Sequence, residues 1–459
     1  MKLIYGIKDR PKFGQVIVFA IQQLLAIMAA TLVVPVIIST SDNIPPELLP
    51  EMSSAAALLG AGIGTLVYQL FTRFKSPVFL GSSFAFIGPM CAAFAGAASV
   101  QAGYLGLIIG AAMAGLVYVL IAVIVKFAGV KWIAKLMPAV VIGPTVAIIG
   151  LSLAGNAIGD LQKAPAGGSV YVAIICGLVT LAVTMLCATF GKKMIRLIPF
   201  IIGILAGYAV AAIFTVIGTV ADIPALLVIN FDPIKSLFAP FTIESIISVP
   251  DLTFMQAIKG VTEINAEYIF TLFVAYVPVA SVVFAEHLAD HKNLSTIIEK
   301  DLLEDPGLHN TLLGDGVGSI AGAIFGGCPN TTYGESVGCV AITGNASVIT
   351  ITVTAFLAIA ISFLSPFVAF VNTIPSCVMG GVCMALYGFI AVSGLKMIQK
   401  VDLEKNRNLF VVSVILITGI GGLSVTFGKV TLTTVACALI LGILANLMLG
   451  IKDKKQDKE

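Results

Sequence analysis

Stretches of roughly 20 apolar residues, the length that an α-helix needs to cross a lipid bilayer, recur from about Gly14 to Gly450. Hydrophobic residues make up 58% of the 459 residues and charged residues 11%, and the mean hydropathy is +1.06. With that composition, a water-soluble globule of this size would expose far too much apolar surface. The sequence therefore predicts an all-α polytopic membrane protein, embedded in a lipid bilayer.

We predict fourteen transmembrane segments in two groups of seven. The first group covers residues 14–39, 52–72, 77–99, 103–126, 132–157, 169–190 and 195–218. The second group covers residues 267–290, 308–327, 328–345, 346–371, 374–399, 407–425 and 430–450. Residues 1–218 then form a first repeat, residues 219–266 an external linker with four prolines, and residues 267–459 a second repeat.

Basic residues orient the predicted spans. An even number of spans places both termini on one side, and all but four of the 26 Lys and Arg residues fall on that side. The four on the opposite side are Lys163, Lys235, Lys259 and Lys429. Because cytoplasmic loops are enriched in Lys and Arg, both termini are expected in the cytoplasm.

A short echo links the two groups of spans. The pattern Pro138-x-x-Val-x-Gly143 in the fifth span recurs as Pro375-x-x-Val-x-Gly380 in the twelfth. Because seven is odd, two such repeats are inverted in the membrane, as in transporters that expose a midplane site to each side in turn. Pro and Gly are also common in membrane helices generally, so the alternative that the echo marks no repeat stays open.

The third and tenth spans are interrupted. Residues 77–89 and 328–343 each combine a β-prone stretch, Pro and Gly with a short apolar run. Extended backbone in lipid would leave N–H and C=O groups unpaired. We therefore predict that residues 79–83 and 330–333 form short antiparallel strands that pair with each other. The half-helices that follow would direct their partly positive N-termini at one central cavity.

Carboxylates inside apolar spans are costly and are normally functional. Glu286 and Asp290 lie one helical turn apart in the eighth span, Asp315 lies in the ninth, and Glu335 opens the second half-helix. Burial raises a carboxylate's pKa, so such a group can be protonated near neutral pH. Proton coupling by Glu286 or Asp290 is one interpretation. Capping or pairing near the membrane interface is the other, and for Asp290 and Asp315 the two are balanced.

Other polar residues allow ordinary interpretations as well. His287, His291 and His309 are placed at or beyond the cytoplasmic membrane edge, where an interfacial role is as plausible as proton relay. Gln22 and Gln23 lie in mid-span, where they can face a substrate cavity or hydrogen-bond between helices.

Catalytic and cofactor motifs are absent from the sequence. The eight cysteines lie in or beside apolar segments without a C-x-x-C pair, which argues against disulfides and zinc. There is neither a Walker A loop nor a G-x-S-x-G elbow. We therefore expect no metal, no cofactor, no nucleic-acid partner and no enzymatic activity.

The motifs at these segments resemble the nucleobase/ascorbate transporter family (nucleobase:cation symporter 2), and within it the bacterial uracil permeases. The resemblance covers nearly the whole chain and is carried by the motifs Asp9-Arg-Pro11, Leu80-Gly-Ser-Ser-Phe-Ala-Phe86, Ala285-Glu-His287, Lys300-Asp-Leu-Leu303, Asp305-Pro-Gly-Leu-His309 and Pro329-Asn-Thr-Thr-Tyr-Gly-Glu335.

This resemblance implies a core domain of spans 1–4 and 8–11, a gate domain of spans 5–7 and 12–14, and a homodimer in a bacterial plasma (inner) membrane. It also implies substrate binding between core and gate. The residues implied in substrate binding are Glu286, Glu335, Phe84, Ser83, Gly334, Tyr333 and Tyr387. Phe84 would contact the flat base, although packing is the usual role of Phe in a membrane span.

The chain departs from the family pattern at three places. Gln22-Gln23 stands where the family commonly has Gln-His, Ser336 where it often has Asn, and Asp290 where some uracil permeases have His. The proton path and the contacts of the first span, including Gln22, Gln23 and Ser336, therefore stay open.

The predicted function is proton-coupled import of a neutral nucleobase, uracil first, by alternating access. A purine carrier for xanthine or urate is the alternative within the family. A carrier of the same architecture for an anion is less favoured, because two acidic groups at the site would repel it. Without a nucleophile motif or a continuous polar stripe, an intramembrane enzyme or a channel is disfavoured.

Overall fold

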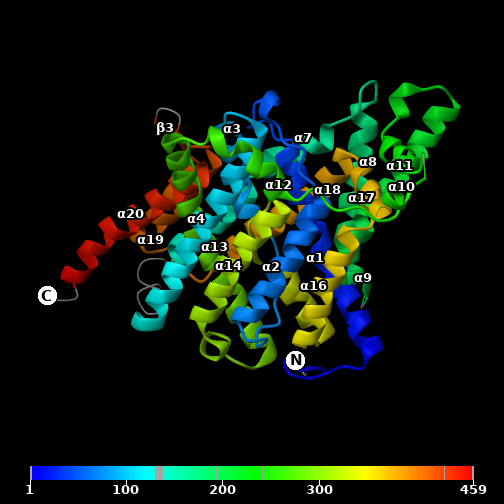
Figure 1. The fold of residues 1–459 in the computed structure, drawn as a ribbon. Coiled ribbons are helices and arrows are strands. Elements are labelled where there is room, and N and C mark those ends of the chain that lie inside the picture. The colour runs from blue at the N-terminus through cyan, green and yellow to red at the C-terminus, as the bar shows by residue number, and fades with distance from the viewer. Residues whose placement is uncertain (1–2, 130–137, 193, 240, 428–429, 457–459) are drawn as a thin grey trace.

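The chain folds into a predominantly helical bundle (Figure 1). A computed structural model describes residues 3–129, 138–192, 194–239, 241–427 and 430–456. The start of the predicted fifth span and the basic residues Lys131, Lys135 and Lys429 lie outside the described residues.

Most of the predicted spans coincide with helices. The elements of the first half are α1 (Phe13–Ser39), α2 (Ser54–Phe71), β1 (Leu80–Ser82), α3 (Ile87–Ala95), α4 (Val100–Ala128), α6 (Ala139–Ser152), α7 (Ala154–Gln162), α8 (Val170–Phe190), α9 (Met194–Leu197) and α10 (Pro199–Val220). Those of the second half are α13 (Ala266–Ile298), α14 (Leu308–Gly326), β2 (Asn330–Thr332), α15 (Gly334–Thr343), α16 (Val348–Ser362), α17 (Ser365–Asn372), α18 (Ser376–Ile398), α19 (Asn406–Ile420), β3 (Val425–Phe427), β4 (Val430–Leu432) and α20 (Thr434–Gln456). The linker carries α11 (Asp232–Leu237), α12 (Thr253–Ala257) and short 3₁₀ turns.

Several of these helices have the length and apolarity of membrane spans. Within the described residues there are eight, namely α1, α2, α4, the α6–α7 stretch, α8, α10, α13 and α18. Shorter apolar helical stretches cover Phe84–Ala95, Val348–Ser362, Asn406–Ile420 and Thr434–Gly450. This architecture is that of a multi-pass α-helical membrane protein.

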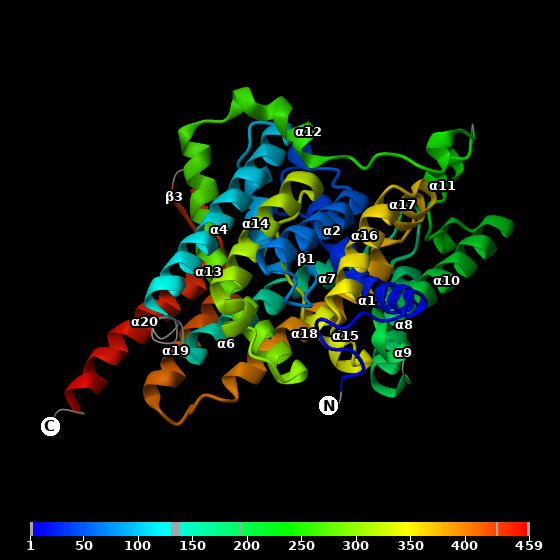
Figure 2. The ribbon, with the colours of Figure 1, turned by 60° about the horizontal axis from the view of Figure 1, so that its bottom comes forward.

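The two interrupted spans pair with each other as predicted. β1 and β2 run antiparallel, with Leu80 opposite Thr332 and Ser82 opposite Asn330. Both strands are fully buried, and β1 lies in the interior of the bundle (Figure 2). Each strand is followed within a few residues by a short helix, α3 or α15. The pairing satisfies backbone groups that would otherwise be unpaired among apolar helices.

Glycines allow close approach between α2 and α14 and between α6 and α18. A Cβ atom on Gly64 of α2 would lie 2.7 Å from the carbonyl oxygen of Gly318 in α14, and a Cβ on Gly318 would lie 2.7 Å from that of Gly64. At the second contact, a Cβ on Gly143 would lie 3.2 Å from the carbonyl oxygen of Gly394. Small residues of this kind let membrane helices pack backbone against backbone.

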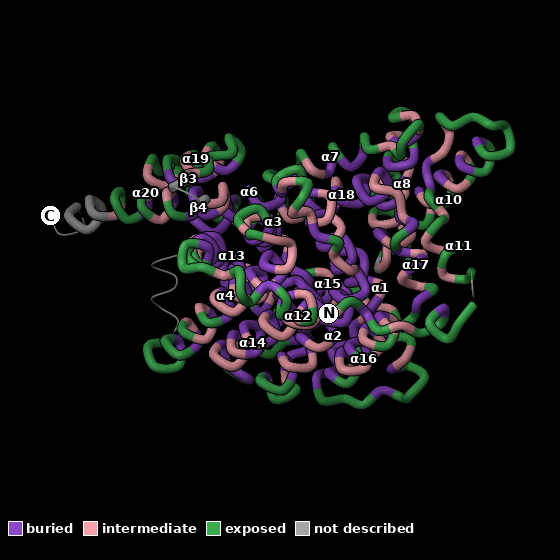
Figure 3. Tube along the Cα trace, turned by 45° about the horizontal axis from the view of Figure 1, so that its top comes forward, coloured by how far each residue is buried: buried purple, intermediate pink, exposed green. Residues whose placement is uncertain are grey.

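The helices fall into two packed groups. α1, α2, α4, α13, α14 and α16 pack mainly among themselves and around the paired strands, whereas α6, α7, α8, α10, α18, α19 and α20 pack mainly among themselves. Buried residues gather where helices face one another, and exposed ones at the loops and the periphery (Figure 3).

Several boundaries in the second half differ from the prediction. The thirteenth and fourteenth spans were expected at 407–425 and 430–450, but residues 425–427 and 430–432 form an antiparallel hairpin, β3–β4. Its Val-Thr-Phe and Val-Thr-Leu segments are rich in the β-branched residues that favour strands. The eighth span was expected to end at residue 290, but α13 continues to Ile298.

Candidate functional site

Acidic side chains gather where α13 passes the paired strands and the start of α15. Glu286 and Asp290 of α13 and Glu335 of α15 are all half-buried, and Glu286 lies within electrostatic range of the other two. The Thr332 hydroxyl at the end of β2 donates a 2.8 Å hydrogen bond to Asp290 Oδ2. Gly334 is exposed, and a Cβ there would meet only Asp290 Oδ1, at 3.8 Å. The structure therefore leaves open space beside these carboxylates at the first turn of α15.

The buried hydroxyl of Ser336 links α15 to two other segments through hydrogen bonds. Its Oγ accepts hydrogen bonds from Gln23 Nε2 of α1 at 2.5 Å and from the backbone N–H of Phe79 at 3.1 Å. Gln23 and Ser336 are therefore engaged with each other. The neighbouring Gln22 is half-buried, and its Oε1 has no hydrogen-bond partner among the described residues.

Ser83 and Tyr333 directly follow the paired strands β1 and β2. The Tyr333 hydroxyl donates a 2.7 Å hydrogen bond to the carbonyl oxygen of Ser82, and its ring covers Gly81. The Ser83 backbone N–H donates to the Pro329 carbonyl at 2.9 Å, which extends the pairing by one residue. The buried Ser83 hydroxyl has no hydrogen-bond partner among the described residues.

Phe84 and Tyr387 meet across the boundary between the two helix groups. Phe84 follows β1, Tyr387 lies in α18, and their rings make an edge-to-face contact with centroids 5.9 Å apart. Tyr387 is 2% exposed, whereas Phe84 is half-buried.

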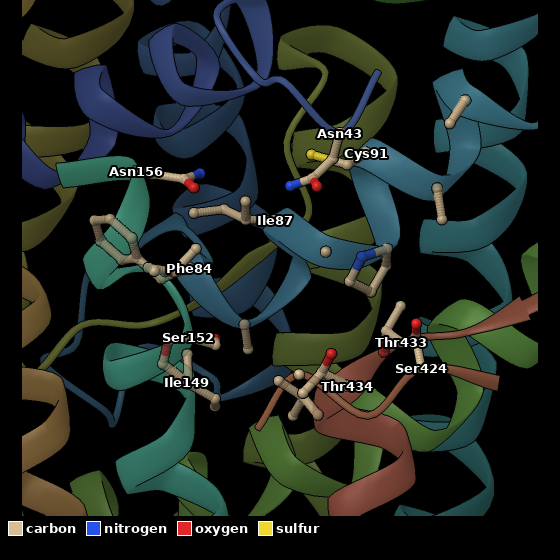
Figure 4. A pocket seen from close by; sticks show the side chains of 18 of the residues that line it. Asn43, Phe84, Ile87, Cys91, Ile149, Ser152, Asn156, Ser424, Thr433 and Thr434 are labelled. Carbon is tan, nitrogen blue, oxygen red and sulfur yellow. Dashed lines mark hydrogen bonds between the residues drawn. The ribbon is translucent and has the colours of Figure 1, made fainter. Parts of the chain in front are cut away.

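Phe84 also lines a cavity of about 500 Å³ between α3, the α6–α7 stretch and the residues on either side of the β3–β4 hairpin (Figure 4). The polar side chains on its wall are Asn43, Ser152, Asn156, Thr271, Ser424, Thr433 and Thr434. Glu286 and Glu335 are not among the lining residues. The cavity thus reaches one residue of the predicted site. Sequence reasoning missed its other polar groups, because Asn, Ser and Thr residues scattered over loops and helices form no motif.

His287 and His291 are buried inside the bundle, and their predicted position at or beyond the membrane edge stays a prediction. Both are 0% exposed. His287 Nδ1 lies 2.7 Å from Asp315 Oδ2, and His291 Nε2 lies 2.7 Å from the Tyr68 hydroxyl. The two imidazole rings stack with centroids 4.0 Å apart. Sequence reasoning missed these buried partners because it placed both histidines at the edge of the eighth span. The carboxylate of Asp315 in the ninth span was the available signal of a buried partner.

The described residues contain no group of three or more His, Cys, Asp or Glu side chains that could hold a metal ion. The carboxylates and the backbone amides at the start of α15 can form hydrogen bonds with a ligand, beside an aromatic ring. This combination suits a small, neutral, polar ligand with N–H groups.

Known proteins share both the sequence and the fold. Residues 14–428 match the permease family. The chain belongs to that family. It is 36% identical to the uracil permease of Bacillus caldolyticus over 451 residues, which covers 98% of this chain and 95% of the relative. It is also 36% identical to the uracil permease of Bacillus subtilis, with 99% and 97% covered. Such permeases are transporters rather than enzymes.

A solved structure shows a similar fold. The transmembrane domain of the cyanobacterial bicarbonate transporter BicA aligns with a TM-score of 0.59, covering 96% of this chain and 99% of that domain. Its sequence identity is 13%, so the likeness concerns the fold alone.

Proposed function

We propose that this chain is a proton-coupled symporter that imports uracil by alternating access. The observation that carries the proposal is the placement of Glu286 and Glu335 beside the paired strands, with open space at Gly334. Membership of the permease family and the similarity to uracil permeases support the substrate.

The proposed chemistry divides the work between the two glutamates. Glu335 lies in the first turn of α15, where the helix N-terminus favours an anion, so it accepts a hydrogen bond from a ring N–H. Glu286 carries the transported proton and shares a hydrogen bond with the base. Asp290, held by Thr332, is the second candidate for proton coupling.

The remaining residues of the site act on shape and position. Phe84 and Tyr387 contact the base at the boundary between the helix groups, and Gly334 leaves room for it. We assign Tyr333 and Ser83 to the wall of the site, formed by the strand ends. Ser336 and Gln23 position the start of α15 through their mutual hydrogen bond, with Gln22 beside them on α1.

A co-transported proton supplies the driving force. Uracil is neutral at pH 7, so the membrane potential does not concentrate it directly. Each charge moved across the membrane gains about 2.3 kcal/mol per 100 mV. Because about 1.4 kcal/mol is a factor of ten, this gain and a modest pH gradient drive accumulation of tens to hundreds of fold.

Fourteen spans in two inverted repeats account for the helix packing. If α2, β1 and α6 correspond to α14, β2 and α18, then each of these elements packs against its own counterpart. Other contacts form matching pairs, since α13 packs on α4 as α1 packs on α16. A twofold pseudo-axis through the bundle would produce this pattern, and it supports residues 1–218 and 267–459 as the two repeats.

The two helix groups support the core and gate assignment. Spans 1–4 and 8–11 correspond to the group around the strands, and spans 5–7 and 12–14 to the other group. We propose that the core shifts against the gate during transport, that both termini are cytoplasmic at a bacterial plasma membrane, and that the protein is a homodimer.

Uptake of labelled uracil into proteoliposomes tests the function. Uracil should accumulate under an inward proton gradient, and accumulation should stop when an uncoupler is added. Uptake that ignores the uncoupler would contradict proton coupling. Stronger competition by unlabelled xanthine than by unlabelled uracil would contradict the assigned substrate.

A further inference from the structure

Residues 238–249, of which all but residue 240 are described, follow α11 in the linker and carry a row of exposed apolar side chains. Their exposed fractions are 45% for Phe238, 65% for Phe241, 84% for Ile243, 47% for Ile246, 55% for Ile247 and 68% for Val249. The row also contains the exposed polar residues Thr242 and Glu244. Exposed apolar residues that gather in one segment favour contact with another protein or with a membrane.

The backbone of this segment is paired with the junction between α16 and α17. The Ser248 N–H donates to the Phe363 carbonyl at 3.0 Å, and the Ser365 N–H donates to the Ile246 carbonyl at 3.1 Å. The Ser365 hydroxyl donates to the carbonyl oxygen of Glu244 at 2.6 Å. Because lipid cannot satisfy free backbone groups, pairing of this kind lets an irregular segment leave the aqueous phase.

The length of α16 gives the depth of the segment. The start of α16 is tied to the N-terminal tail, since the Val348 N–H donates to the Ile7 carbonyl at 3.1 Å. That tail carries Lys8, Arg10 and Lys12 and therefore lies at a membrane surface. The 15 residues of α16 rise about 22 Å, which is less than the hydrocarbon thickness of about 30 Å.

The end of α16 therefore does not reach the opposite membrane surface. Any tilt of the helix would shorten its reach across the bilayer further. Leu364 follows that end and forms an antiparallel bridge with Ile247. Residues 238–249 are thus held at the level of the outer part of a leaflet rather than above it.

The surroundings of the segment fit a lipid neighbour. α11 lies at the outer edge of the bundle beside α17 in two views (Figures 1 and 2). The neighbouring helix α10 also carries exposed apolar residues, among them Ile213 and Val220. Between Lys235 and Lys259 the chain has no Lys or Arg.

We propose that residues 238–249 lie in the membrane–water interface of the leaflet opposite the N-terminal tail, with their apolar side chains against lipid acyl chains. The segment then anchors the linker between the two repeats to the bilayer. Covering by a second copy of the chain is the competing outcome of the test.

Tryptophan fluorescence can test this contact, because Trp132 is the chain's single Trp. In a Trp132→Phe background, Ile243→Trp is placed as reporter in phosphatidylcholine vesicles whose acyl chains are brominated near the carbonyl end. We expect a blue-shifted emission maximum and the loss of more than half of the emission relative to unbrominated vesicles. Lys235→Trp is the control expected in water, because the Lys235 ammonium lies 3.8 Å from the Asp232 carboxylate as an ion pair.

Quenching of Ile243→Trp no stronger than that of Lys235→Trp would overturn the proposal. A blue-shifted but unquenched emission would also overturn it, in favour of a second copy that covers the segment. Phe241→Trp, an aromatic exchange in the same row, repeats the measurement if Ile243→Trp does not fold. Ile213→Trp on α10 is the lipid-facing reference.

Discussion

At the scale of single residues, the two glutamates of the site differ in their helix environment. Glu335 lies in the first turn of α15, at the end of the helix where unpaired amides favour negative charge. Glu286 lies within the 33-residue helix α13, far from either end, with Asp290 one turn further along. Environments that favour opposite protonation states assign different roles to paired carboxylates.

Glu286→Gln should separate binding from proton coupling. The amide preserves the shape of the side chain and can donate a hydrogen bond, but it cannot exchange a proton. We expect measurable uracil binding by isothermal titration and the loss of proton-driven accumulation in proteoliposomes. If the variant still accumulates uracil with the same pH dependence, the proton is carried elsewhere, and Asp290→Asn is the next variant to measure.

Glu335→Ala should weaken binding itself. Removing an acceptor leaves a ring N–H of the bound base unpaired, at a cost of about 1–3 kcal/mol or more. We therefore expect the Kd for uracil to rise by roughly five- to 150-fold. Glu335→Gln is the matched control, because its amide oxygen still accepts and should restore part of the affinity. Equal affinity of Glu335→Ala and the parent protein would remove Glu335 from the site.

At the scale of elements, α2 and α14 are held together by backbone contact rather than by large side chains. Gly64 faces Gly318 so closely that neither position has room for a Cβ. The side chain of Asn330 in β2 also lies against Gly64 and donates to the Gly60 carbonyl at 3.0 Å. The same glycines therefore position the strands that form the site.

Gly64→Ala should destabilise the protein by forcing α2 away from α14. Overpacking of this kind costs about 1–3 kcal/mol, so we expect a lower melting temperature in detergent and weaker uracil binding. Gly159→Ala in α7 is the control, because a Cβ there meets nothing within 4 Å. Equal melting temperatures for the two variants would contradict the close contact.

At the scale of the whole molecule, the two helix groups meet at a narrow boundary beside the cavity. Phe84 and Tyr387 touch across it. On the far wall of the cavity, a Cβ on Gly88 of α3 would lie 4.0 Å from the Cβ of Thr433 before α20. That separation is within the range of a disulfide.

The double variant Gly88→Cys and Thr433→Cys should therefore cross-link the groups. If transport requires movement of one group against the other, oxidation should abolish uracil uptake and a reductant should restore it. Each single variant is a control and should keep its uptake under oxidation, since the eight native cysteines are present in all three proteins. Full uptake by the cross-linked double variant would contradict movement at this boundary.

Much of this architecture followed from the sequence by itself. The length of an apolar run sets whether it can cross a bilayer, so most helices were predicted within a few residues of their bounds. The pairing of residues 79–83 with 330–333 followed because unpaired backbone cannot persist in lipid. The β3–β4 hairpin was missed, although the alternation around Gly428-Lys429 is a hairpin signal, because its strands adjoin or overlap two apolar runs that were assigned to the spans at 407–425 and 430–450.

Only the tertiary structure decided which polar groups are partners. Gln23 meets Ser336 and His287 meets Asp315, and nothing local to either sequence position determines such a pair. Partners of this kind depend on how each helix rotates and on which distant helix it packs against. For the same reason, the cavity beside Phe84 and the exposed row at residues 238–249 were visible only in the tertiary structure. The roles of the proposed site residues remain predictions that rest on the sequence and on the tertiary structure. The sequence supplied the carboxylates, and helix packing alone placed them beside the paired strands.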